Sequence, residues 1–323
     1  MNVLLSSAGR RVALLDIFRQ AQRSIGCGGR VFAADMSVYA SAFHAADDAF
    51  VVPRCTHPEF IPTILEECVR RDVRLVIPTI DTELPAYAAA RADFEAAGIH
   101  VAVSSPETIR IAADKVLTHE WLVRSGLPTV RQASLQEARA ASEGWPLPAI
   151  AKPRAGSSAI GVTLVRSKEE LDALGDRSDY ILQELAGGEE YTVDFWVDRS
   201  GVCRSAIPRK RLEVRAGEVS KAVTARRDEL LETTFAVARA LPEPFGVLNV
   251  QMFLDPDSGR VAIIEVNPRF GGGYPLAWEA GARYAEWLMR DLLDLPIDAA
   301  PMGWRDGLVM LRYDAAVFFE ERP

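Results

Sequence analysis

The strongest constraint on the fold is the alternation of short apolar runs with amphipathic stretches through the first hundred residues. Five runs have the length and composition of buried strands: residues 3–5, 31–34, 49–52, 75–77 and 99–103. Helical periodicity appears between them, most clearly over residues 58–71, where Phe60, Ile64 and Cys68 recur on one face. This alternation predicts a doubly wound α/β domain, in which ligands bind beyond the carboxyl ends of parallel strands.

Polar residues stand where these expected strands end. Arg10 and Arg11 follow the first strand at the start of a helix, where they either hold an anion or lie in a solvated first turn. Asp81 and Glu83 follow the fourth strand, and we expect them to hold a substrate amino group. The alternative is that Asp81 only caps the following helix. The first turn contains the single glycine Gly9, whereas a dinucleotide-binding loop needs three, so that class is disfavoured.

Composition narrows the functional classes. The chain has 323 residues, of which 49% are hydrophobic and 25% charged, which predicts a globular protein of two or three domains. Its apolar runs are too short for a membrane span or a signal peptide, so we expect a cytoplasmic protein with no membrane partner. The net charge of −8 and the lack of a basic run argue against nucleic acid as a partner. The four cysteines and four histidines show no zinc or disulfide spacing.

The remaining sequence divides into further units. Ser105 and Pro106 form a helix N-cap pattern, and Pro128 follows a helix stop, so a helical connector is expected between them. A short strand, loop, strand, helix and strand then make a unit too small to fold alone, which we expect to act as a lid. Longer strands follow. We therefore expect an N-terminal domain (1–105), a connector (106–148), a lid (149–185) and a large lobe (186–323).

A hairpin in the large lobe is expected to carry polar side chains on one face. A turn centred on Ser258 pairs Gln251 with Glu265 and Asn249 with Asn267, with Cβ atoms about 5 Å apart. The alternate residues are expected to supply the core: Val250, Met252, Ile264 and Val266. Amide and carboxylate oxygens in a row suit Mg²⁺, which prefers oxygen ligands and substrate phosphates. A solvated outer face is the alternative.

Two segments of the lid have features of a nucleotide site. A strand delivers Lys152 into a loop of small residues, whose backbone N–H groups can approach phosphate oxygens. The loop lacks the ending of a P-loop, so an ordinary glycine turn is the alternative. In the linker after Gln183, backbone groups can bind an adenine edge and a following carboxylate can bind ribose, although an acidic turn explains the same residues.

The end of the expected hairpin has features of an acid-binding site. Arg269 can fork onto a carboxylate, and the three glycines that follow can support developing charge through their amides. This suits an acid that is converted to an acyl phosphate. A basic segment over residues 209–221, which includes Lys221, either touches substrate or forms a solvated hairpin.

Together these motifs resemble the ATP-grasp ligases, in the branch similar to carbamoyl-phosphate synthetase. The resemblance covers nearly the whole chain and implies a two-lobed ATP-grasp fold, of α/β and α+β class, after the N-terminal (pre-ATP-grasp) domain. Four motifs carry it, in order: Lys115 after Asp114; Lys152 with its small-residue loop; Gln183-Glu184 followed by Glu189-Glu190-Tyr191; and Gln251 with the run from Glu265 to Arg269.

The resemblance also implies roles for individual residues. Those implied for ATP are Lys115, Lys152, Ser157, Ser158, Gly161, Gln183, Glu184, Leu185 and Glu190. Those implied for Mg²⁺, or Mn²⁺ in its place, are Gln251, Glu265 and Asn267. Those implied for substrate are Arg269, Gly271, Gly272, Gly273, Asp81, Glu83, Arg10 and Lys221, with Arg269 and Lys152 as the catalytic residues. Many relatives carry an acid where Gln251 stands, which leaves the number of metal ions open, and full carbamoyl-phosphate synthetases carry two such units where this chain has one.

The implied function is an ATP-dependent carboxylate–amine ligase that forms ADP through an acyl phosphate. The expected partners are a small carboxylic or amino acid and an amine, and a homodimer is one possible assembly state. Two alternatives stay open at this point. One is a carbamoyl-phosphate synthetase-like enzyme that phosphorylates carbamate or a carboxylate and stops there, and the other is a non-catalytic ATP-binding module.

Overall fold

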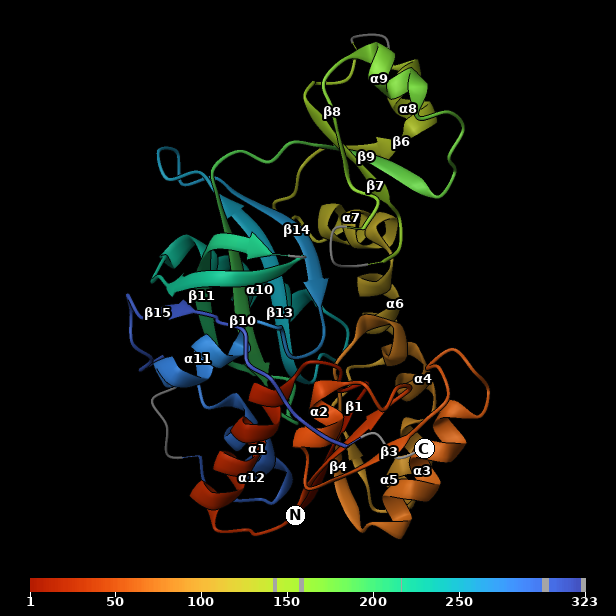
Figure 1. The fold of residues 1–323 in the computed structure, drawn as a ribbon. Helices are drawn as coiled ribbons and strands as arrows, with labels where there is room; N and C mark the ends of the chain where they lie inside the picture. Colours follow the sequence, from red (N-terminus) through yellow and green to blue (C-terminus); the bar gives the residue numbers. More distant parts are fainter. Residues whose placement is uncertain (142–143, 157–159, 216, 298–301, 321–323) are drawn as a thin grey trace.

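The computed structural model describes residues 1–141, 144–156, 160–215, 217–297 and 302–320. Within them the chain forms three sheets that occupy different parts of the molecule (Figure 1). The N-terminal sheet lies at one end, a small four-stranded sheet lies at the other, and a six-stranded sheet lies alongside. Among the helices described, none combines the length and apolar character that crossing a membrane would require.

The N-terminal domain is a parallel sheet with the strand order β3-β2-β1-β4-β5. Its strands are β1 (Asn2–Ser6), β2 (Val31–Asp35), β3 (Asp48–Val51), β4 (Val73–Pro78) and β5 (His100–Val101). Its helices are α1 (Val12–Ile25), α2 (Ser41–Ala45), α3 (Phe60–Arg70), α4 (Leu84–Ala89) and α5 (Arg91–Ala96). The order confirms the predicted doubly wound domain. Strand order reverses between β1 and β4, so the loops after these two strands meet where such sheets bind ligands.

The connector and the lid follow. The connector consists of α6 (Pro106–Ala113) and α7 (Lys115–Arg124). The lid sheet has the order β6-β9-β7-β8, with α8 and α9 beside it. Its elements are β6 (Gln132–Ser134), α8 (Leu135–Ala140), β7 (Ala149–Pro153), β8 (Thr163–Val165), α9 (Lys168–Ala173) and β9 (Tyr180–Glu184). The lid therefore begins earlier than the expected residue 149, because β6 pairs with β9 and α8 supplies Leu135 and Ala138 to the lid core.

The large lobe is built on a sheet with the order β14-β13-β10-β11-β12-β15. Its strands are β10 (Glu189–Val197), β11 (Cys203–Arg215), β12 (Glu218–Thr224), β13 (Gly246–Leu254), β14 (Val261–Asn267) and β15 (Val309–Leu311). Its helices are α10 (Asp228–Ala240), α11 (Tyr274–Ala280) and α12 (Tyr284–Leu292). The lid and this lobe together give the two-lobed ATP-grasp architecture that the resemblance implied.

The N-terminal domain and the large lobe share one hydrophobic core. Helix α1 packs against α11 and α12, and the Phe18 ring meets the Phe270 ring edge-on with centroids 5.7 Å apart. Trp278 Nε1 donates to Gln20 Oε1 at 3.2 Å across the same boundary. The lid has a separate, smaller core. The surfaces where the N-terminal sheet meets the large lobe are therefore fixed by packing.

The β13–β14 hairpin has the predicted pairing near its open end. Asn249 lies opposite Asn267, and Gln251 lies opposite Glu265. The register then shifts by one residue, so that Met252 pairs with Ile263. The prediction that Ile264 is a core residue is therefore wrong: Ile263 is fully buried in its place, and Ile264 is turned toward a cavity. The four polar residues Asn249, Gln251, Glu265 and Asn267, here called the polar row, keep the predicted register because the shift begins after Gln251.

Candidate active site

Two cavities meet at the polar row of the β13–β14 hairpin. The first, here called the lid cavity, has a volume of about 420 Å³ and lies between the lid and the large lobe. The second, here called the sheet cavity, has a volume of about 220 Å³ and lies between the large lobe and the N-terminal loops after β1 and β4. Both are lined by Gln251, Glu265, Arg211 and Gly217. A ligand in one cavity can therefore lie next to a ligand in the other.

Two lysines line one end of the lid cavity. Lys152, on β7, is buried and donates from Nζ to Gln183 Oε1 at 2.7 Å. Burial lowers the pKa of Lys152 to about 8, opposed by the charge of Glu265 and aided by that of Lys115. Lys115, at the start of α7, donates from Nζ to Gly156 O at 2.8 Å, and burial lowers its pKa too. Two partly desolvated ammonium groups near one carboxylate suit the binding of phosphate groups.

The rest of the lid cavity combines an apolar slot with polar edges. Its apolar lining includes Ile150, Val162, Phe253 and the displaced Ile264. Such a slot fits a flat ring that is bound by its faces. The polar residues at the edges of the slot form hydrogen bonds. Glu190 Oε1 accepts from Arg211 Nη1 at 2.7 Å and from Gln251 Nε2. Glu184 Oε2 accepts from the Arg131 backbone N–H at 3.2 Å, and Gln183 Nε2 donates to Gln132 Oε1 at 3.2 Å.

The small-residue loop needs one correction. Ser157 and Ser158 lie outside the described residues. Gly161 does not line the lid cavity, although its neighbours Ile160 and Val162 do. Its backbone has φ = +75°, and a Cβ there would lie 2.7 Å from the Tyr180 hydroxyl. Gly161 is therefore placed by the turn and by the close approach of Tyr180, and its expected contact with ATP is not supported.

The polar row between the cavities is suited to a hard cation. Glu265 supplies a carboxylate, and Asn267 Nδ2 donates to its Oε1 at 3.1 Å. Asn249, opposite, accepts from Asn267 Nδ2 at 3.3 Å. One carboxylate with neighbouring amide oxygens, beside a lysine-lined cavity, fits Mg²⁺ whose remaining ligands are phosphate oxygens and water.

The sheet cavity brings together the predicted Arg269 and Asp81. Arg269 Nη2 and Asp81 Oδ2 are 2.6 Å apart, and the two side chains are 13% and 27% exposed. Arg269 Nε is buried and has no hydrogen-bond partner within the described residues. The guanidinium thus keeps an unused donor next to the polar row.

The glycines after Arg269 allow close packing against the cavity wall. A Cβ on Gly273 would lie 2.2 Å from Arg209 Nη1, so a side chain there would displace that guanidinium. Arg209 is 1% exposed and makes a two-bond ion pair with the fully buried Asp194, through Nε at 2.6 Å and Nη2 at 3.2 Å. Gly271 and Gly272 line the same cavity.

Two predicted substrate residues do not line the sheet cavity, and other arginines line it in their place. Arg10 is largely exposed and lies 3.8 Å from Glu218, whereas Arg11 lines the sheet cavity and donates from Nη2 to Thr79 O at 3.0 Å. Lys221 is half-exposed and pairs with Glu213, and it does not line the sheet cavity, so the structure gives no support to its expected substrate contact. The cations of that basic segment which do line the sheet cavity are Arg209 and Arg211. Their spacing of two residues on one strand was the signal that could have identified them.

Glu83 also has a different place from the expected one. It is fully buried and accepts hydrogen bonds from Ser6 Oγ, Ser7 Oγ and the backbone N–H groups of Thr79 and Ile80, at 2.6, 2.8, 2.6 and 3.1 Å. Burial raises its pKa, and these hydrogen bonds oppose that shift. Glu83 therefore ties the loops after β1 and β4 together, and because both of its oxygens are used inside the protein, the structure gives no support to its expected contact with a substrate amino group.

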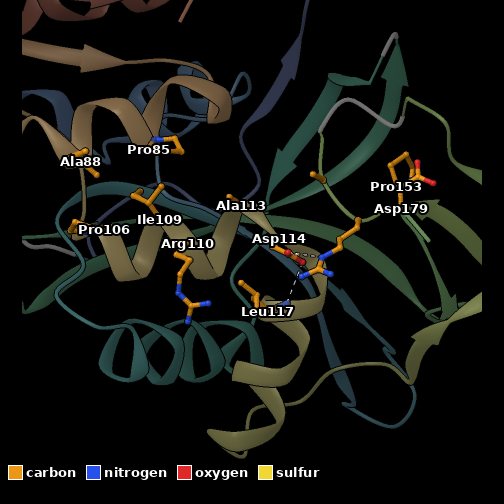
Figure 2. A pocket seen from close by; sticks show the side chains of 13 residues that line it. Pro85, Ala88, Pro106, Ile109, Arg110, Ala113, Asp114, Leu117, Pro153 and Asp179 are labelled. Atoms are coloured by element: carbon orange, nitrogen blue, oxygen red, sulfur yellow. Dashed lines mark hydrogen bonds and ion pairs between the residues drawn. The ribbon is translucent and has the colours of Figure 1, made fainter. Parts of the chain in front are cut away.

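A further cavity lies apart from this chemistry. It has a volume of about 710 Å³ and lies between α4, α6, α7 and β7, lined mainly by small and apolar residues (Figure 2). Figure 2 shows Asp114 beside Ala113 and Leu117. Asp114 Oδ2 accepts from Arg154 Nε at 2.6 Å, and the Lys115 backbone N–H donates to Arg154 O at 3.0 Å. These contacts tie the lid to the helix that carries Lys115.

Comparisons with known proteins agree with this architecture. A family model described as "ATP-grasp domain" matches residues 112–273, half of the chain, and one described as "PylC-like, N-terminal domain" matches residues 3–102. The carbamoyl phosphate synthase large chain of Halomonas eurihalina is 25% identical over 203 residues, covering 57% of this chain and 19% of that protein. Carnosine synthase 1 of Gallus gallus is 28% identical over 212 residues, covering 54% and 22%. The chain thus spans about a fifth of the length of these relatives.

Solved structures show the same fold at low sequence identity. The biotin carboxylase domain of the 2-oxoglutarate carboxylase of Hydrogenobacter thermophilus, crystallised with magnesium ADP, ADP and bicarbonate, superposes with a TM-score of 0.73 at 17% identity. The match covers 95% of this chain and 73% of that one. Together, the two family models and the lid and large lobe described above show that this chain is a member of the ATP-grasp family.

Proposed function

We propose that the protein is an ATP-dependent carboxylate–amine ligase, which forms an amide-type C–N bond with release of ADP and phosphate. The observation that carries this proposal is the shared border of the two cavities at Gln251 and Glu265. On one side lie the ammonium groups of Lys115 and Lys152, and on the other lies the guanidinium of Arg269. A phosphate donor and an anionic acceptor can therefore meet at a single carboxylate.

ATP is assigned to the lid cavity. Lys115 and Lys152 hold its phosphates, the apolar slot holds adenine near the backbone of Glu184 and Leu185, and Glu190 binds the ribose. Gln251, Glu265 and Asn267 would hold Mg²⁺, which when bound neutralises charge on the transferring phosphoryl group. The family membership and the lysine-lined end of the cavity support this assignment.

The acid is assigned to the sheet cavity. Arg269 Nε donates to its carboxylate, and the amides of Gly271 to Gly273 support developing charge. The carboxylate oxygen attacks the γ-phosphorus, a new O–P bond forms, and the bond from phosphorus to the ADP oxygen breaks. An acyl phosphate and ADP result. The protein contributes mainly position and charge to this step, because phosphoryl transfer needs no nucleophilic side chain.

The amine then displaces phosphate from the acyl carbon. The ammonium first gives one proton to water, the resulting amine nitrogen forms the C–N bond, the bond from carbon to the phosphate oxygen breaks, and the second nitrogen proton leaves with the released phosphate. We assign Asp81 and Glu218, two carboxylates that line the sheet cavity, to hold the amine. For Asp81 this requires that its ion pair with Arg269 is shared with, or yields to, the incoming ammonium.

A screen for ADP release tests the proposal. The purified protein with MgATP is supplied with small carboxylic and amino acids, singly and in pairs with amines, and with bicarbonate alone. We expect ADP and phosphate only when an acid and an amine are both present, with a new amide detected by mass spectrometry. Release with bicarbonate alone, or a stable phosphorylated product without an amine, would replace the ligase proposal by a phosphorylating enzyme. Bound ATP without turnover in any combination would indicate a binding module.

A further inference from the structure

Four arginines line the sheet cavity, and three of them are neutralised by a carboxylate. Arg269 is paired with Asp81 at 2.6 Å, Arg209 with Asp194 at 2.6 Å, and Arg211 with Glu190 at 2.7 Å. The fourth is Arg11. Within the described residues, no carboxylate lies within 4.0 Å of its guanidinium, and its one side-chain hydrogen bond runs from Nη2 to Thr79 O at 3.0 Å.

The missing partner leaves a positive charge in a desolvated place. Burial and the neighbouring Arg269 lower the pKa of Arg11 to about 10, while the more distant carboxylates of Glu218, Asp81 and Glu83 partly offset this. A guanidinium that is held by one carbonyl keeps its other N–H donors for a ligand. Charged groups in such surroundings are normally paired, so the cavity is electrostatically incomplete without an anion.

A carboxylate fits this position better than a phosphate ester. A planar guanidinium matches a carboxylate through two parallel hydrogen bonds. The same cavity is lined by the carboxylates of Asp81 and Glu218, which would repel a doubly charged phosphate group at Arg11 more strongly than a singly charged carboxylate group. The volume of about 220 Å³ is below the range of roughly 300–1,000 Å³ that holds drug-sized ligands, so the ligand is small.

Arg11 and Arg269 are close enough for their charges to interact, and each guanidinium offers donors of its own, so the cavity can hold one carboxylate at each of them. The reacting carboxylate must lie at the polar row, next to Glu265 and Arg269, to reach the phosphate donor. Arg11 lies at the N-terminal wall of the cavity, at the start of α1, where it is bonded to the loop after β4. An anion bound there lies on the side of the cavity formed by the N-terminal domain.

We propose that Arg11 is a specificity-determining residue that binds a second, non-reacting carboxylate, so that one of the two substrates carries a carboxylate in addition to its reacting group. This rests on the proposed ligase function. The carboxylate has two sources: a dicarboxylic acid, or an amino acid that serves as the amine. In either case the substrates are small polar metabolites with a free carboxylate, and simple monocarboxylic acids paired with simple amines are poor substrates.

A binding experiment tests the site without requiring turnover. Thermal stabilisation of the full-length protein with MgADP is measured for the dicarboxylic acids from malonate to adipate and for the common amino acids. Each probe is compared with the counterpart in which one carboxylate is converted to an amide. We expect at least one probe to stabilise the wild-type protein more than its amide does. A panel in which every probe and its amide act alike overturns the proposal.

Matched variants identify the residue responsible. Arg11→Gln should abolish the difference between the probe and its amide, whereas Arg10→Gln, which removes the neighbouring but exposed guanidinium, should keep it. Arg11→Lys keeps the positive charge but loses the planar guanidinium that can donate two parallel hydrogen bonds, so it should retain part of the difference between the probe and its amide. Melting of the ligand-free variants reports on folding. An undiminished difference in a folded Arg11→Gln or Arg11→Lys protein overturns the proposal.

Kinetics with substrates from the ADP-release screen separate the two sources. Loss of one charge-assisted contact should raise the KM for the carboxylate-bearing substrate by about 10- to 100-fold in Arg11→Gln, with the KM for ATP unchanged. A rise confined to the acid identifies a dicarboxylic acid, and a rise confined to the amine identifies an amino acid. Equal KM values in wild type and variant overturn the proposal. If the ligase proposal itself fails, no ADP is released, yet the binding difference at Arg11 is still measured.

Discussion

Arg269 and Asp81 stand 188 positions apart in the chain and form an ion pair of 2.6 Å between Nη2 and Oδ2. Arg269 follows β14 of the large lobe, and Asp81 follows β4 of the N-terminal sheet. The pair therefore joins the side of the candidate site that we assign to the acid to the edge of the N-terminal sheet where its strands end. Because it spans two domains, it also contributes to how they are held together.

The first prediction concerns this pair. Asp81→Asn keeps a hydrogen-bond acceptor but removes the charge opposite a mostly buried guanidinium. We expect the free energy of unfolding to fall by about 1 kcal/mol, because the pair is partly exposed to solvent. Urea unfolding measures this, with the exposed Asp257→Asn as the control. Arg269→Gln combined with Asp81→Asn should cost less than the two single changes added together. Full additivity would show that the two residues do not act as a pair.

The second prediction concerns Glu265, the carboxylate of the polar row. Glu265→Gln changes the charge at the border of both cavities with little change in volume. We expect kcat for ADP release to fall by at least about 100-fold, because stabilisation of charge on the phosphoryl group is lost. The melting temperature should stay close to that of the wild type. Glu213→Gln, which alters an exposed pair with Lys221, serves as the control and should keep full activity. A Glu265→Gln enzyme that turns over normally would be incompatible with the assignment.

The third prediction is a pH dependence of ATP binding. The pKa of Lys152 is about 8 in the ligand-free protein, so its ammonium is mostly charged below pH 8 and loses its proton as the pH rises through that value. Bound phosphate favours the charged form, so the Kd for ATP should rise above pH 8, by up to about tenfold per pH unit. Titration of a fluorescent ATP analogue from neutral to alkaline pH measures this. Lys152→Arg keeps its charge throughout, so the part of the rise that comes from Lys152 should disappear and the profile should be less steep than that of the wild type. The same rise in both proteins would remove Lys152 from the phosphate site.

The fourth prediction concerns the glycines beside Arg209. Gly273→Ala places a Cβ 2.2 Å from Arg209 Nη1, whereas the same change at Gly187 meets nothing within 4 Å. Because Arg209 is buried and held by Asp194, it cannot move aside freely. We expect Gly273→Ala to destabilise the protein by about 1–3 kcal/mol and Gly187→Ala to change stability by less than about 0.5 kcal/mol. Equal unfolding midpoints for the two variants would contradict the packing described here.

Periodic patterns in the sequence predicted the N-terminal domain and the centre of the site, whereas the two-lobed architecture was implied by the resemblance to the ATP-grasp ligases. The alternation in the N-terminal domain and the pairing of Gln251 with Glu265 follow from buried strands and a short turn, which are local features. The strand β6 was missed because its three residues, Gln132 to Ser134, are polar or small and carry no alternating pattern. It becomes a strand only through pairing with β9.

The errors at the site arise from features that sequence spacing does not encode. A one-residue register shift turned Ile264 out of the core, and nothing in the sequence marks it. The choice between Arg10 and Arg11 depends on the exact entry of the chain into α1. Glu83 appeared equivalent to Asp81, but hydrogen bonds from Ser6, Ser7 and the loop after β4 hold it inside the protein. Such assignments depend on contacts between distant segments.

The central claim is that a carboxylate in the sheet cavity attacks the phosphate donor held in the lid cavity. It is tested most directly with the acid substrate labelled with ¹⁸O in its carboxylate. If an acyl phosphate forms and the amine displaces phosphate from it, one labelled oxygen passes from the acid into the inorganic phosphate, and mass spectrometry of the released phosphate should show that transfer. Phosphate without label, released together with the amide product, would contradict the claim.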